Sequence, residues 1–156
     1  MASAQSIMKL FANLGMALYD HDPDANTALI VSPDAGTTLR YIDMRDCNNF
    51  AAIAMSSALT GAGITLLEIV ASETITFAAV TVIKTSGAVV CDAVGDYVVE
   101  ECTAEEVGYL AAAAGLDLRY VAARITVANA ADEAVVAYVE GNKRWAYSGL
   151  TADTIS

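Results

Sequence analysis

Two stretches in the second half of the chain alternate regularly in side-chain character. Between residues 119 and 127 every second position is apolar, and the intervening positions include Tyr120, Arg124 and Thr126. A period of two places the two sets on opposite faces of a β-strand. Residues 134–140 also form two alternating sets, Val135, Ala137 and Val139 against Val136 and Tyr138. Polar turns at 129–132 and 141–143 connect these runs to a third one at 144–147. The pattern predicts an antiparallel meander at this end of the chain.

Shorter β-rich runs predict further strands in the first two-thirds of the chain. Each is bounded by a turn rich in Asp, Asn, Gly, Ser or Pro, as at 20–26, 32–36 and 60–63. About seven short strands favour a mainly β fold, an antiparallel β-sandwich of jelly-roll type, with a β-rich α+β fold as the alternative. The runs lie at 37–41, 50–55, 64–71, 76–85, 88–91 and 96–102.

One helix is predicted between the strands, at about 103–114. Thr103 and Glu106 have the spacing of a capping box, in which each side chain bonds the other residue's backbone amide. Val107 and Ala111 lie on one narrow apolar face, and Gly115 supplies the C-terminal stop. The sequence therefore predicts a single inserted helix of about three turns.

The N-terminal segment 1–19 is compatible with more than one structure. Its apolar residues fit one face of a helix, and those near its end also fit a strand. A third possibility is an arm that becomes ordered on a neighbouring subunit. We expect a single domain over 20–150, with this segment before it and a loose tail at 151–156.

Composition and charge restrict the kinds of partner. Hydrophobic residues make up 56% of the 156 residues, which exceeds the usual ~45–50%. The excess fits either a large core or a surface buried against other subunits, and it raises the expectation of a homo-oligomer. A net charge of −11 argues against nucleic acid as a partner, because such surfaces need clustered Lys and Arg. No apolar run reaches the ~18 residues of a membrane span, and the first residues lack the basic region of a signal peptide, so we expect no membrane contact and synthesis in the cytoplasm.

The residues that carry chemistry are few, and no catalytic, metal or cofactor site is predicted. His21, the single histidine, lies in an acidic loop, where an exposed surface position is expected. The alternating carboxylates at 20, 22 and 24 resemble the start of a calcium loop, but Ala25 and Val31 stand where Gly and the closing Glu belong. We therefore expect a solvated acidic turn here.

Four further groups have structural explanations. The odd number of cysteines, Cys47, Cys91 and Cys102, suits buried, reduced thiols with no zinc-binding spacing. The adjacent pair Glu100 and Glu101 should point to opposite faces of a strand, so the two carboxylates cannot share a pocket. Glu105 and Glu106 are explained by helix capping, and residues 61–63 by a turn rather than a phosphate-binding loop.

Trp145 and Tyr147, which follow Lys143 and Arg144, are the best candidates for a contact patch. Aromatic and Arg side chains are enriched at the centres of interfaces. Packing of Trp145 in the core is the alternative.

The segments at 49–54, 61–68, 120–126 and 132–138, taken in this order, resemble small structural proteins of tailed-bacteriophage virions. In this sequence they read NFAAIA, GAGITLLE, YVAARIT and DEAVVAY. The resemblance lies in the Ala-, Val- and Thr-rich composition of these segments and in their order, over roughly three-quarters of the chain. Capsid decoration (cement) proteins, many of which are trimers at capsomer junctions, are the most similar class.

This resemblance implies a non-enzymatic β-sandwich that stabilises the head of a particle by binding between capsid subunits. The implied partners are the major capsid protein or other virion proteins, with a homotrimer favoured, and the implied location is the capsid surface. A neck, tail or fibre-attachment protein, or a non-viral ligand-binding module, is the alternative.

Overall fold

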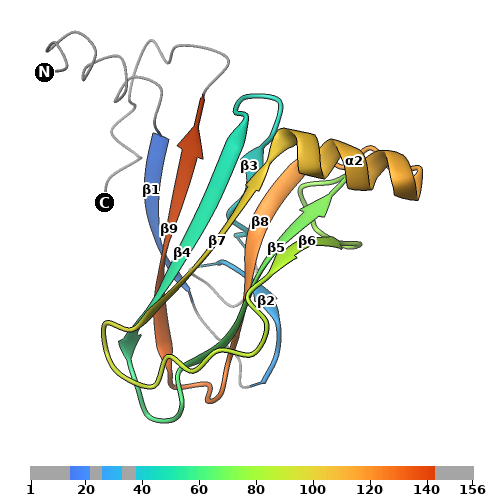
Figure 1. Cartoon of the computed structure of the whole chain (residues 1–156). Helices are drawn as coiled ribbons and strands as arrows, with labels where there is room; N and C mark the ends of the chain where they lie inside the picture. Colours follow the sequence, from blue (N-terminus) through green and yellow to red (C-terminus); the bar gives the residue numbers. More distant parts are fainter. Residues whose placement is uncertain (1–14, 22–25, 33–37, 143–156) are drawn as a thin grey trace, which may run out of the picture.

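The described residues form two antiparallel sheets packed face to face, with one helix at the end of the sandwich (Figure 1). The structure is a computed structural model that describes residues 15–21, 26–32 and 38–142. One sheet, here called sheet A, has the strand order β1 (Gly15–His21), β9 (Glu133–Gly141), β4 (Asn49–Ala58) and β7 (Tyr97–Thr103). Sheet B has the order β2 (Leu29–Ile30), β8 (Tyr120–Val127), β5 (Ile64–Ser72) and β6 (Thr81–Thr85), and β3 (Ile42–Asp43) also pairs with β8. These sheets confirm the predicted mainly β sandwich.

The strand pairs are nested, which is the arrangement of a jelly roll. β1 pairs with β9, β2 and β3 pair with β8, β4 pairs with β7, and β5 pairs with β6. If β2 and β3 are taken as one interrupted strand, the described chain has eight strands. The first then pairs with the eighth, the second with the seventh, the third with the sixth and the fourth with the fifth. A chain paired in this way rolls into two sheets that share one core.

The meander expected at the C-terminal end is wrong. β8 and β9 follow one another in the chain, but they lie in different sheets, and residues 128–132 cross from one sheet to the other. Alternation of side chains reports which face of a strand is buried and carries no information about which strand lies beside it. The short turn between the two strands therefore looks like a hairpin in the sequence.

Three of the predicted strands are absent or reduced. In the predicted run 37–41, residues 38–41 lie outside strands. Residues 76–80 form turns and bends before β6, and Phe77 has a left-handed φ of 49°. Residues 88–91 contribute only isolated bridges at Cys91. Tyr41 and Phe77, the aromatic residues of the first two runs, pack over the outside of sheet B.

The core lies between the sheets and is centred on aromatic residues of sheet A. Phe50 and Tyr138 meet edge to face, with ring centroids 5.0 Å apart, and both are almost fully buried. The hydroxyl of Tyr138 accepts from the amide of Ala123 at 2.8 Å and donates to the carbonyl of Arg40 at 3.1 Å, so its polar atom is satisfied across the sandwich. Large aliphatic residues fill the remaining space, among them Ile64, Leu67, Ile69, Val121, Ile125 and Val136.

The helix α2 (Ala104–Ala114) lies in the connection from β7 to β8, and its predicted position is confirmed. The hydroxyl of Thr103 accepts from the amide of Glu106, and the carboxylate of Glu106 accepts from the amide of Thr103. Gly115 ends the helix in a left-handed conformation. Val107 and Ala111 are the buried residues of the helix, which packs across one end of the sandwich (Figure 1).

Of the N-terminal segment 1–19, whose form the sequence leaves open, residues 15–19 belong to β1 at the edge of sheet A. Residues 1–14 and the predicted tail at 151–156 lie outside the described residues. The proposed contact patch at 143–147 lies outside them as well.

Candidate functional site

The outer face of sheet A is apolar where a solvent-facing sheet would be polar. On β4, the residues that alternate with the buried Phe50, Ala52 and Ala54 are Ala51, Ile53 and Met55, and these point away from the core. An antiparallel sheet with one face in water normally alternates apolar inward and polar outward residues. Here the outward residues of β4 are as apolar as the inward ones.

Strand register extends this apolar surface into three rows across the sheet. Met55 lies opposite Val135 and Tyr97, Ile53 lies opposite Ala137 and Val99, and Ala51 lies opposite Val139 and Glu101. Leu18 on β1 continues the middle row beside Ala137. We call this set the sheet A face: Leu18, Ala51, Ile53, Met55, Tyr97, Val99, Val135, Ala137 and Val139.

The sheet A face is exposed within the described part of the chain. Tyr97 is 67% exposed, Leu18 55%, Val99 44% and Met55 39%, and the other members are partly buried. With strands ~4.8 Å apart and same-face residues ~6.8 Å apart, the nine positions of the face cover about 300 Å². Contiguous apolar patches of a few hundred Å² on a protein surface are often functional.

Sheet B contrasts with sheet A because the chain itself covers its outer face. Val70 and Ala122 point outward from β5 and β8 and are fully buried, and they form a second small core with Phe77. Tyr120 and Leu39 pack against this cluster. Tyr41 meets Tyr120 edge to face, at 5.4 Å between ring centroids. The segments 38–41 and 76–80, which do not form strands, therefore cover the outer face of sheet B, whereas the outer face of sheet A remains exposed.

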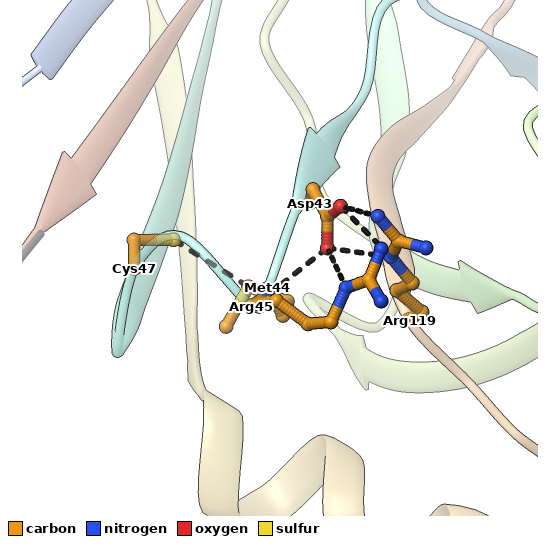
Figure 2. Close-up of polar contacts among 5 residues, drawn as sticks. All are labelled: Asp43, Met44, Arg45, Cys47 and Arg119. Atoms are coloured by element: carbon orange, nitrogen blue, oxygen red, sulfur yellow. Dashed lines mark hydrogen bonds and ion pairs between the residues drawn. The ribbon is translucent and has the colours of Figure 1, made fainter. Parts of the chain in front are cut away.

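Ion pairs also gather on the sheet B side. Arg119 binds the carboxylate of Asp43 through both Nε and a terminal nitrogen, and Arg45 approaches the same carboxylate at 3.5 Å (Figure 2). Arg124 binds Glu68 at 2.7 Å across the outer face of sheet B. These pairs neutralise basic side chains locally, so the cations of this side are already occupied by acidic partners.

The two remaining basic residues among those described are also engaged. The guanidinium of Arg40 lies 5.1 Å from the ring centroid of Tyr19, and Lys84 pairs with Glu106. The hydrogen bond from Lys84, with help from the Thr103 amide, lowers the pKa of Glu106 below its ordinary value. A shallow pocket of about 380 Å³ beside this pair is lined by residues that include Asn49, Glu101 and Val139, and it borders the sheet A face.

His21 is buried, so the expectation of an exposed surface histidine is wrong. Only 4% of it is exposed, and its Nδ1 accepts from the amide of Ser32 at 3.4 Å. The residue ends β1, and pairing with β9 draws it inward. Residues 22–25 of the calcium-like run lie outside the described residues, and the described part of the chain holds no cluster of three or more His, Cys, Asp or Glu suited to a metal ion.

The other residues considered for chemistry lie apart from one another. Cys47, Cys91 and Cys102 are all free and buried, and burial raises the pKa of Cys102 to about 12, which leaves it an unreactive thiol at neutral pH. Glu100 is half-buried, whereas Glu101 is exposed at the border of the sheet A face, so the two carboxylates lie on opposite faces as expected.

The sequence of β9 carries a signal of the sheet A face. In residues 134–140, both alternating sets are apolar, Ala134, Val136 and Tyr138 on one side and Val135, Ala137 and Val139 on the other. A strand that is apolar on both sides is typical of one covered on both sides. Recognising the face also required the register of four strands that are distant in the sequence.

No family model, no curated protein and no solved structure matches the chain. In the part of the chain that the structure describes, no helix is both long enough and apolar enough to cross a membrane.

Proposed function

We propose that the chain is a non-enzymatic structural protein of a virus particle, most similar in role to capsid decoration proteins, and that it docks through the sheet A face. The observation that carries the proposal is the breadth of this face, which spans all four strands of the sheet. Its burial against another protein would remove roughly 300 Å² of apolar surface from water, at about 25 cal/mol per Å². A docking role explains why this surface is apolar.

The remaining features are compatible with this role. Jelly rolls occur in viral capsid and lectin domains, and a fold of this kind does not by itself specify one function. The net charge of −11 keeps an apolar-faced subunit soluble before it assembles. The sequence texture favours a virion, with the major capsid protein as the first candidate partner and a homotrimer as the expected oligomer.

The first experiment measures the copy number of the chain in purified particles from its source by quantitative mass spectrometry. A number comparable to that of the major capsid protein supports a decoration role over the whole lattice. A much smaller number supports a neck or tail position. Absence from every particle fraction would overturn the virion proposal and favour the ligand-binding module.

A matched pair of variants tests whether docking uses the sheet A face. Val99→Thr exchanges a methyl group for a hydroxyl on the face, and Val90→Thr makes the same exchange at a valine that is 73% exposed on the loop before β7. We expect Val99→Thr to reduce the amount of chain retained in particles about fivefold, since an interface centre tolerates a polar group poorly. Val90→Thr should be retained like the wild type, and equal retention of the two variants would exclude the face.

A further inference from the structure

The sheet A face combines an apolar centre with a negative surrounding field, and this combination restricts what can cover it. Glu101 borders the face on β7 and Glu133 lies at its end on β9, and both are exposed. The described basic side chains are engaged elsewhere, four of them with carboxylates and Arg40 over an aromatic ring. No unpaired cation therefore borders the face within the described residues.

The charge of the whole chain excludes several occupants on electrostatic grounds. Phospholipid surfaces of the cytoplasmic leaflet and nucleic acids are anionic, so both repel a chain of net charge −11. A second copy placed face to face on this surface would set the Glu101 and Glu133 carboxylates of the two copies near each other, which disfavours this contact. A homotrimer formed through other surfaces does not bring these carboxylates together. A protein surface of opposite sign is attracted over the same distances.

The shape of the face favours a broad, flat partner such as another sheet. Ala137 lies between Leu18 and Ile53, and Ala51 lies between Val139 and Glu101, so each short side chain leaves a hollow between larger ones. Side chains of a second sheet can enter such hollows, as in sheet-on-sheet packing at ~10 Å.

Resting on the proposed function, we infer that the partner of the sheet A face is a different protein, which presents a flat apolar surface bordered by Lys and Arg side chains. The apolar contact supplies most of the affinity, and the acidic border sets the orientation and the rate of association. Complex formation should therefore weaken as salt concentration rises.

Charge-reversal variants of the full chain test this inference. The double variant Glu101→Lys/Glu133→Lys reverses the border, and Asp46→Lys/Asp117→Lys makes the same change in net charge at exposed positions away from the face. Each is expressed with a tag in the source cells, and the fraction retained in high-mass particles is measured at 50 and 300 mM salt. We expect the border variant to lose about tenfold in retention at low salt and the control variant to lose less than twofold.

Zero-length carbodiimide coupling of the wild-type particles identifies the neighbour. Coupling of Glu101 and Glu133 to lysines of a different protein supports the inference. Coupling to lysines of another copy, together with stronger self-association of the border variant in sedimentation equilibrium, would assign the face to a second copy and overturn it.

The two proposals fail in different ways. Loss of Val99→Thr from particles with full retention of the border variant would keep the docking role and overturn the basic border. Equal retention of Val99→Thr and Val90→Thr would overturn the docking role itself.

Discussion

Gly63 occupies a position that a side chain does not fit. Its φ is +65°, and a Cβ atom there would lie 2.1 Å from the carbonyl oxygen of Cys91 and 2.8 Å from the side chain of Leu59. The backbone of Cys91 cannot move away without breaking its bridge to Gly63. The sequence shows this region only as a turn, because the close approach depends on a segment 28 positions away in the chain.

We expect Gly63→Ala to lower the free energy of unfolding by about 3 kcal/mol, since it adds backbone strain and an overlap with a fixed carbonyl. Gly87 has the same φ of +65°, with nothing within 4 Å of a Cβ atom, and is the matched control. Gly87→Ala should cost only the strain, about 1 kcal/mol. Urea denaturation measures both values, and equal losses would contradict the steric explanation.

At the scale of elements, local signals were sufficient for the helix and insufficient for the strands. The ends of α2 are set by residues within the segment itself, namely the Thr103–Glu106 capping box and Gly115, and its predicted range matches the structure. β1 is different because Leu18 suits a helix stripe and a strand equally well, and its state depends on pairing with β9, more than 100 residues later. Apolar patterns alone do not resolve such a case.

β1 contributes seven paired residues and an aromatic contact to sheet A. Tyr19 meets Tyr138 edge to face at 5.2 Å, and the described register runs from Gly15 opposite Glu140 to His21 opposite Ala134. Both features should make the strand part of the folded core.

We expect removal of residues 1–21 to lower the melting temperature by about 10 °C, which corresponds to about 3 kcal/mol for a chain of this length. Removal of residues 1–14 leaves every described pair of β1 in place and should change the melting temperature much less. Calorimetry measures the melting temperatures of the two truncated chains. A similar decrease in both would show that the stabilisation comes from residues 1–14 and not from β1.

At the scale of the whole molecule, Asp132 joins two loops by hydrogen bonds at one end of the sandwich, and each of these loops connects one sheet to the other. Its carboxylate accepts from the amides of Thr60, Gly61 and Gly63, at 2.7, 2.8 and 3.0 Å. These amides belong to the connection from β4 to β5, and Asp132 belongs to the connection from β8 to β9 (Figure 1). Burial alone would raise the pKa of Asp132, but the three amides outweigh it and hold the pKa below its ordinary value.

The stabilisation from the Asp132 hydrogen bonds should depend on pH. Because the folded pKa lies below the unfolded one, the stabilisation is fully present above the unfolded value of about 4, and it is lost as the pH falls further. We expect Asp132→Asn to lower the free energy of unfolding by about 2 kcal/mol at pH 7, with a smaller difference from wild type at pH 3. Denaturation curves at both pH values measure this, and a constant difference would contradict an ionised Asp132.

The sheet A face was harder to predict than the fold, because it depends on which residues of different strands lie side by side. The buried residues of β8 follow from its alternation, and the sandwich follows from the number of predicted strands. The apolar face became visible only when Met55, Val135 and Tyr97 were found side by side. The burial of His21 has the same origin, since its loop-like sequence gives no sign of the strand to which it pairs.

The nested pairing also determines when the sheet A face comes into existence during synthesis. Its residues come from β1, β4, β7 and β9, so the first and last strands of the described fold must both be present before the surface is complete. Pairing between such distant segments is slow, because the loop must close before the contacts form. A nascent or truncated chain that lacks β9 therefore lacks the finished surface, and the sheet A face forms only after the last described strand has paired.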